Sequence, residues 1–224
     1  MASFPDLNRS QLDAAIVDLD GTLVDTLPDF VVVLNAMLDE LKLPAIDDNF
    51  VAHSVGKGSE HLIRRTLAQV GADAHLYDDA WAFYQQHYER VNGTHAVVFD
   101  GAEEGLAMLQ AAGLRLACLT NKPGAFARTL LDQKGLARYF THVFGGDAFE
   151  RKKPDPLPLL KTCEALASAP SRTLMIGDSS NDAQAARAAG CPVVLVTYGY
   201  NHGEPIRGVD ADGFVDRLDE LVLR

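Results

Sequence analysis

The stretch Ala14-Ala15-Ile16-Val17-Asp18-Leu19-Asp20-Gly21-Thr22-Leu23 places two carboxylates directly after a run of apolar residues. The run predicts a buried strand, and because alternate residues of a strand point the same way, Asp18 and Asp20 emerge together at its carboxyl end. Burying two unpaired acids is costly unless a cation neutralises them, and carboxylate oxygens suit Mg²⁺. The pattern therefore predicts a metal-assisted site, although an ordinary strand-to-helix turn capped by Asp20 is the alternative.

Length and composition limit the class of protein. The chain has 224 residues with 47% hydrophobic and 23% charged residues, which is typical of a globular protein with a sizeable core. No apolar stretch is long enough for a bilayer and the first residues lack signal-peptide features, so we expect a cytoplasmic protein without membrane association. A net charge of −11 argues against nucleic-acid partners, which need a basic face. We expect a monomer or homodimer.

Apolar runs and helical patterns alternate along the rest of the chain. Strands are expected at residues 114–119, 141–144, 173–176 and 193–196, and helices at residues 102–112, 124–136, 156–168 and 181–189. This alternation predicts a doubly wound, Rossmann-like α/β fold with a mainly parallel sheet. In such sheets ligands bind at the carboxyl ends of the strands, so the residues that end each strand matter most.

One segment, residues 26–96, departs from this rhythm. Phe30, Leu34 and Leu38 keep helical spacing, and further helical patterns follow in the same segment. We therefore expect an all-helical cap domain at residues 26–96, inserted after the first strand. Residues 1–25 and 97–224 would form the catalytic core.

Polar side chains follow three of the later strands. Thr120 and Asn121 could hold phosphate oxygens, although a threonine that only caps a helix has the same sequence. Lys153 could reach a phosphate as a point charge, although most lysines in basic segments are solvated. Asp178 would complete the metal site, and Asp182, one turn into the next helix, would orient ligands or serve only as a dipole partner.

Together these segments resemble the haloacid dehalogenase-like phosphohydrolases. The match consists of Asp-x-Asp-Gly-Thr at residues 18–22, Thr-Asn at 120–121, Lys-Pro at 153–154 and Gly-Asp-Ser-x-x-Asp at 177–182, in that order. The helical insertion also lies where this family carries its cap. The resemblance covers nearly the whole chain.

The resemblance implies a mechanism. Asp18 would attack phosphorus and form an aspartyl-phosphate, with Asp20 as general acid and then base. Mg²⁺ would be bound by Asp18, Asp178 and the main chain of Asp20. The phosphate oxygens would be held by Thr120, Asn121 and Lys153. An acid at position 20 excludes the dehalogenases of the family.

The segment Gly56-Lys57-Gly58, followed by Arg65, resembles the cap loop and helix of bacterial phosphoglycolate phosphatases. This resemblance implies a small phosphorylated metabolite, 2-phosphoglycolate, as substrate, with Lys57 near its carboxylate. Alternatively, the two glycines only join two helices and Lys57 is solvated. A phosphatase for N-acetylmuramic acid 6-phosphate, pyrophosphate or a sugar phosphate, a phosphomutase and a catalytically silent binding protein are the other possibilities.

Overall fold

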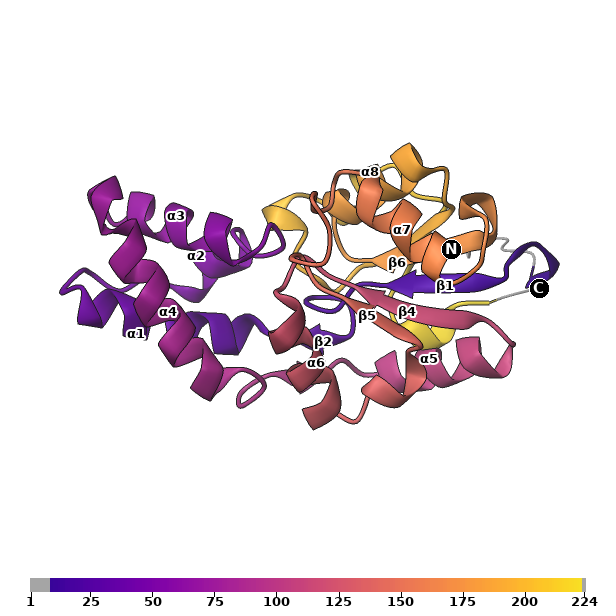
Figure 1. Ribbon diagram of the computed structural model, residues 1–224, viewed down its shortest axis with the longest axis horizontal. Coiled ribbons are helices and arrows are strands. Elements are labelled where there is room, and N and C mark those ends of the chain that lie inside the picture. Colours follow the sequence, from indigo (N-terminus) through magenta and orange to yellow (C-terminus); the bar gives the residue numbers. More distant parts are fainter. Residues whose placement is uncertain (1–8, 223–224) are drawn as a thin grey trace.

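The computed structural model describes residues 9–222, and its core is a six-stranded sheet in the order β5-β4-β1-β6-β7-β8 (Figure 1). Every neighbouring pair of these strands is parallel. The strands are β1 (Ala14–Val17), β4 (Arg115–Leu119), β5 (His142–Phe144), β6 (Thr173–Gly177), β7 (Val193–Val196) and β8 (Gly213–Val215). The predicted doubly wound α/β fold is confirmed, and each of the predicted strands forms.

Helices cover both faces of the sheet because β1 is apolar on both. Ala15 and Val17 pack against one helical layer, whereas Ala14 and Ile16 pack against the other. The first layer holds α5 (Ala102–Ala111) and α6 (Gly124–Gln133), and the second holds α7 (Leu157–Ala165) and α8 (Ser180–Ala189). Among residues 9–222, no helix is long and apolar enough to cross a membrane.

Four helices form a separate group beyond the strand ends (Figure 1). They are α1 (Leu27–Glu40), α2 (Asp48–Ala52), α3 (Ser59–Gln69) and α4 (Tyr77–Val91). Their apolar side chains gather in a core of their own, in which Leu34, Ile63 and Tyr84 are fully buried. The Tyr88 ring stacks on Phe30 at 5.5 Å and on Tyr84 at 5.3 Å between ring centroids. The aromatic residues of α4 therefore build much of the core of this group, which we call the cap, and the Tyr88 ring also contacts Phe126 of α6 at 4.7 Å.

The chain enters and leaves the cap through a small ribbon that the sequence did not predict. Strands β2 (Val24–Asp25) and β3 (Val97–Val98) pair antiparallel, and each is too short to show a periodic pattern. Next to this ribbon, the buried Asp29 carboxylate accepts hydrogen bonds from the N–H groups of Gly93 at 2.6 Å and His95 at 2.7 Å. These bonds tie the two connections together, so the cap is anchored at one end.

Short 3₁₀ helices complete the fold. They occupy Arg9–Gln11, Ala74–Leu76, Ala137–Tyr139, Pro170–Arg172, Asn201–Gly203, Ile206–Gly208 and Leu218–Glu220. The segment that contains Asn201–Gly203 follows β7 and reaches the cap loop. There the Asn181 amide lies 3.1 Å from His202 Nε2 and donates to the Gly56 carbonyl at 3.3 Å.

Candidate active site

The polar residues that follow the strands meet at the centre of the sheet. Strand β1 lies between β4 and β6, with Val17 beside Cys118 on one side and Ile176 on the other. The chain crosses the sheet in opposite directions on the two sides of β1, which makes this the topological switch point where α/β sheets bind ligands. Asp18, Thr120 and Asp178 are each the residue that directly follows one of these three strands. The topology therefore delivers them to one place.

Three buried carboxylates form the base of the site. Oxygens of Asp18, Asp178 and Asp182 all lie within 4.8 Å of one another. Burial, only partly offset by Lys153, raises the pKa of Asp18 to about 7. Burial and the neighbouring Asp182 and Asp18 raise the pKa of Asp178 well above its usual value. These three carboxylates repel one another when they are ionised. A divalent cation bound by their oxygens would remove this repulsion, so the cluster fits such an ion.

Lys153 supplies positive charge to this cluster. Its Nζ lies 3.0 Å from Asp18 Oδ1, donates to Asp182 Oδ1 at 2.7 Å and donates to the Leu119 carbonyl at 2.9 Å. Burial opposes the ammonium charge, but the attraction of Asp18 and Asp182 outweighs it and raises the pKa of Lys153. The ammonium thus donates two hydrogen bonds and pairs electrostatically with Asp18, whose Oδ1 is buried and accepts no hydrogen bond among the described residues. Lys153 is held rigidly beside the Asp18 carboxylate.

Asp182 has two roles in the fold at once. One oxygen accepts from Lys153, and the other accepts from the Ser179 N–H at 3.1 Å and the Ser179 hydroxyl at 2.8 Å. The bond from the Ser179 N–H is one half of a capping box at the start of α8, and the other half runs from the Asp182 N–H to the Ser179 side chain. Asp182 therefore fixes the lysine and the helix together, and its side chain also belongs to the carboxylate cluster.

The segment after β4 connects the core to the cap. The Asn121 amide donates to the carbonyls of Gly56 and Lys153, each at 2.9 Å, and its Oδ1 accepts from the Lys153 N–H at 3.0 Å. The Thr120 hydroxyl accepts from the Lys122 N–H at 3.2 Å. The Asn121 side chain is thus committed to main-chain partners, and it positions Lys153 and the cap loop relative to each other.

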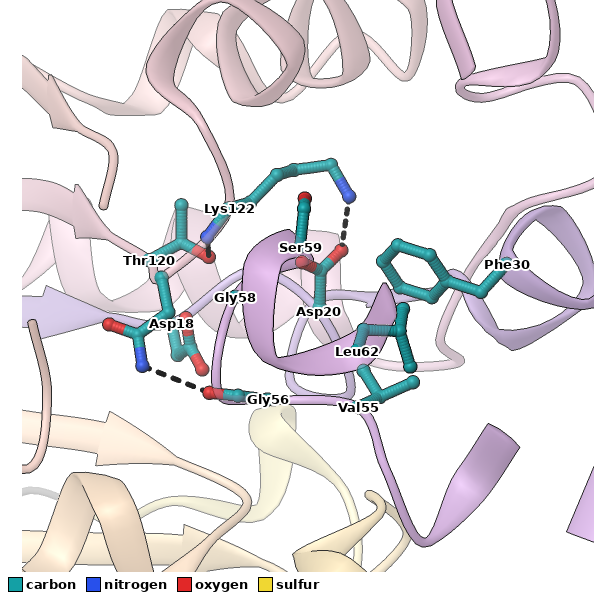
Figure 2. A pocket seen from close by; sticks show the side chains of 11 residues that line it. Asp18, Asp20, Phe30, Val55, Gly56, Gly58, Ser59, Leu62, Thr120 and Lys122 are labelled. Carbon is teal, nitrogen blue, oxygen red and sulfur yellow. Dashed lines mark hydrogen bonds and ion pairs between the residues drawn. The ribbon is translucent and has the colours of Figure 1, made fainter. Parts of the chain in front are cut away.

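A small cavity lies between the strand ends and the cap (Figure 2). Its volume is about 20 Å³, which holds little more than one water molecule. The core contributes Asp18, Asp20, Thr120, Asn121 and Lys122, and the cap contributes Phe30, Val55, Gly56, Gly58, Ser59 and Leu62. The cap half of the cavity is thus mainly apolar, and the core half is charged and polar.

Lys122 lines the cavity, and no role was assigned to it from the sequence. Its side chain is 1% exposed, and its Nζ lies 2.8 Å from Asp20 Oδ1 (Figure 2). The Asp20 carboxylate therefore pairs with Lys122 on the cap side and stands apart from the carboxylate cluster. The only signal in the sequence was the place of Lys122 two residues after Thr120, and a lysine in such a segment usually indicates a solvated side chain.

The cap loop places its main chain, and not its cations, at the cavity. Gly56 and Gly58 have φ angles of +104° and +87°, and a Cβ on Gly58 would lie 3.3 Å from the Asn121 carbonyl oxygen. Lys57 is exposed and is not among the residues that line the cavity. Arg65 is also exposed and lies over the Phe50 ring at 5.8 Å. Of the predicted cap residues, the structure brings only the two glycines to the cavity.

Lys57 nevertheless acts on the entrance of the site. Burial and the positive charge of Lys57 lower the pKa of both His61 and His202. His202 is the residue that contacts Asn181 across from Gly56. The loop after β7 and the cap loop thus meet around one exposed cation and two imidazoles whose protonated form it disfavours.

Comparison with known proteins agrees with this geometry. Residues 15–196 match the sequence model of the haloacid dehalogenase-like hydrolases. The phosphoglycolate phosphatase of Thiobacillus denitrificans is 43% identical over the whole chain and 98% of its own length. The plasmid-encoded phosphoglycolate phosphatase of Cupriavidus necator is 44% identical over 93% of the chain and 90% of its own length.

A solved structure extends the comparison to three dimensions. The crystal structure of a predicted phosphoglycolate phosphatase from Haemophilus somnus superposes with a TM-score of 0.89 at 31% identity, covering 94% of this chain and 96% of that one. Sequence and structure therefore agree along nearly the full length, with cap and core both included. The chain belongs to the haloacid dehalogenase-like hydrolase family.

Proposed function

We propose that this protein is a Mg²⁺-dependent phosphatase that hydrolyses 2-phosphoglycolate to glycolate and phosphate. One observation supports the reaction type most directly: the Asp18 carboxylate is buried at the floor of the cavity between core and cap, 3.0 Å from the Lys153 ammonium. The substrate is supported by the relatives, whose names specify phosphoglycolate phosphatase and which match almost the whole chain.

The reaction begins with Asp18. Its carboxylate attacks phosphorus, the ester bond to the leaving oxygen breaks, and an aspartyl-phosphate forms on Asp18. Lys153, already fixed beside Asp18, offsets the negative charge that accumulates on the phosphoryl oxygens, and Thr120 and the main chain of Asn121 hold those oxygens. Asp20 gives a proton to the leaving oxygen and then takes one from the water that hydrolyses the intermediate.

The carboxylate cluster would hold the metal ion. Asp18 and Asp178 would be side-chain ligands together with the main chain of Asp20, and Asp182 would keep Lys153 and Asp178 in place. A bound Mg²⁺ supplies neutralisation of the phosphate and nucleophile charges. Mg²⁺ is favoured because the donors are all oxygens and the group is compact.

The cap would control which phosphate ester reaches Asp18. A cavity of about 20 Å³ has no room for a phosphate ester, so entry requires the cap to move away from the strand ends. We propose that residues 26–96 form the cap domain that makes this movement, and that residues 1–25 and 97–224 form the catalytic core. When the cap closes again, Phe30, Val55 and Leu62 exclude water from the reacting groups.

Phosphate release measures the proposal directly. We would compare kcat/KM for 2-phosphoglycolate, N-acetylmuramic acid 6-phosphate, pyrophosphate and sugar phosphates, with Mg²⁺ and after its removal by a chelator. A preference of about 100-fold for 2-phosphoglycolate, about 3 kcal/mol of differential transition-state binding, supports the substrate. A preference for another ester retains the mechanism and rejects the substrate. Full activity in Asp18→Asn rejects the mechanism.

A further inference from the structure

We propose that Lys122 recognises the carboxylate of the substrate and is the main specificity-determining residue of the site. The inference rests on the proposed function, because it assumes a phosphate ester whose leaving group carries a carboxylate. Three features of Lys122 support it: its spare hydrogen-bonding capacity, its position beside Asp20, and its being the one cation among the described residues that line the cavity.

The Lys122 ammonium is buried with fewer partners than it can bind. Among the described residues it donates only to Asp20, at 2.8 Å, although an ammonium has three N–H groups. The rings of Phe30 and Tyr88 face it at 4.7 and 5.1 Å from their centroids. These aromatic faces stabilise the charge and limit its movement, but they do not satisfy its remaining N–H groups. The ammonium is thus held in place with capacity for a further anion.

The ammonium of Lys122 lies where the carboxylate of a 2-phosphoglycolate leaving group is expected. Asp20 must lie against the ester oxygen to protonate it, and in 2-phosphoglycolate a single carbon separates that oxygen from the carboxylate. A cation that already touches Asp20 from the cap side is therefore within reach of the carboxylate of a bound substrate (Figure 2). Ion pairing with a carboxylate in a water-excluded site is strong enough to select between substrates.

The other lysines of the region are less suited to this role. Lys153 already donates to the Leu119 carbonyl and to Asp182 and forms an ion pair with Asp18, so its charge is committed to the carboxylate cluster. Lys57 is exposed and lies outside the set of cavity-lining residues. Among the described residues that line the cavity, Lys122 is the only one with a positive charge. The cap half of the cavity is apolar apart from Ser59 and the main chain of the two glycines, so among the described residues it offers no second cation.

A purely structural role for Lys122 makes a different prediction. If the ammonium serves only as counter-ion to Asp20, its removal lowers activity on every phosphate ester by the same factor. If it binds the substrate carboxylate, its removal lowers activity mainly on esters that carry one. The ratio of two kcat/KM values measured on the same preparation separates the two roles, and it does not depend on how much of the variant is folded.

The experiment compares 2-phosphoglycolate with ethyl phosphate, which has a methyl group in place of the carboxylate. For the full-length enzyme with Mg²⁺, we expect Lys122→Met to reduce the ratio of kcat/KM for 2-phosphoglycolate to that for ethyl phosphate by about 10- to 100-fold. Lys122→Arg retains the charge and should keep most of the ratio. Lys161→Met, a loss of an exposed lysine on α7, should leave the ratio unchanged.

Three results would overturn the inference. An equal fall for both substrates in Lys122→Met assigns Lys122 a structural role and leaves the proposed function intact. A ratio that falls in Lys57→Met but not in Lys122→Met assigns carboxylate recognition to the cap loop. A wild-type enzyme without preference for 2-phosphoglycolate over ethyl phosphate rejects both the inference and the proposed substrate.

Discussion

Tyr200 joins the loop after β7 to the entrance of the cap, and we predict that removing its hydroxyl destabilises the protein. The hydroxyl accepts hydrogen bonds from the N–H groups of Thr26 at 2.9 Å and Leu27 at 3.0 Å, and it donates to Asp25 Oδ1 at 2.6 Å. Tyr200→Phe removes all three bonds without removing the ring. The main-chain N–H of Tyr200, which donates to Asp178 at 2.8 Å, is not changed.

The size of the effect follows from what each partner can do afterwards. The Leu27 N–H keeps a second acceptor, Asp25 Oδ1, at 3.2 Å. The Thr26 N–H belongs to a fully buried residue and loses its acceptor, which costs about 1–3 kcal/mol. The bond to the Asp25 carboxylate adds about 1 kcal/mol, because this half-buried group regains part of its solvation. The free energy of unfolding should therefore fall by about 3 kcal/mol.

Urea unfolding followed by circular dichroism measures this change from the shift in midpoint. In a thermal scan of a chain of this size, the same change lowers Tm by about 6–12 °C. Tyr198→Phe is the matched control: Tyr198 lies in the same loop, and the one hydrogen bond of its hydroxyl to the described residues goes to the Thr22 carbonyl at 2.8 Å. We expect the control to lose about 1 kcal/mol. If Tyr200→Phe loses no more than Tyr198→Phe, the hydroxyl does not fix the cap entrance.

Three further predictions follow from the site. The raised pKa of Asp18 means that the folded, metal-free protein holds a proton between about pH 4 and about pH 7 that the unfolded chain releases, so its stability should fall as pH rises through this window. The fall should be smaller in Asp18→Asn, and Mg²⁺ should raise Tm more at about pH 8 than at about pH 5; equal slopes for the two proteins would contradict the assignment. Gly58→Ala should lower the free energy of unfolding by about 1–3 kcal/mol, because φ is +87° and the new Cβ meets the Asn121 carbonyl, whereas Gly208→Ala should have no effect in the same denaturation assay. Lys57→Ala should change KM for the substrate by less than about 3-fold because the side chain is exposed outside the cavity, and a larger change would return carboxylate binding to the cap loop.

The fold could be predicted from the sequence because its strands are continuous apolar runs. Strand β1 is buried on both faces, so Ala14–Val17 shows no polar position at all, and the acids that follow it mark the strand end. The ribbon of β2 and β3 could not be found in this way. Its strands have two residues each, and Val97 is 64% exposed, so neither alternation nor hydrophobicity marks it.

The residues of the candidate site also fall into those that the sequence could predict and those that it could not. Asp18, Thr120 and Asp178 could be grouped from the sequence because parallel strands bring their carboxyl ends to one edge of the sheet. The environment of Lys122 could not be predicted from the sequence, because it depends on Phe30 and Tyr88 of the cap, which approach Lys122 only in the folded protein. The exposure of Lys57 could not be predicted either. Gly56 and Gly58 have positive φ angles, and sequence spacing does not show whether a turn of this kind directs its central side chain to the cavity or to solvent.

The charges of the site explain how a protein with a net charge of −11 can bind an anion. The site holds four carboxylates and two ammonium groups. Lys153 forms ion pairs with Asp18 and Asp182, and Lys122 forms one with Asp20. The fourth carboxylate, Asp178, lies beside Asp18 and Asp182. With every group ionised, two negative charges are uncompensated, and a phosphate would be repelled. A divalent cation balances them, and the raised pKa of Asp18 shows that protons otherwise take over part of this task. We therefore expect the metal ion to be required for substrate binding as well as for the chemical step. Lys122 would then pair with the carboxylate of the substrate, which the metal ion does not reach.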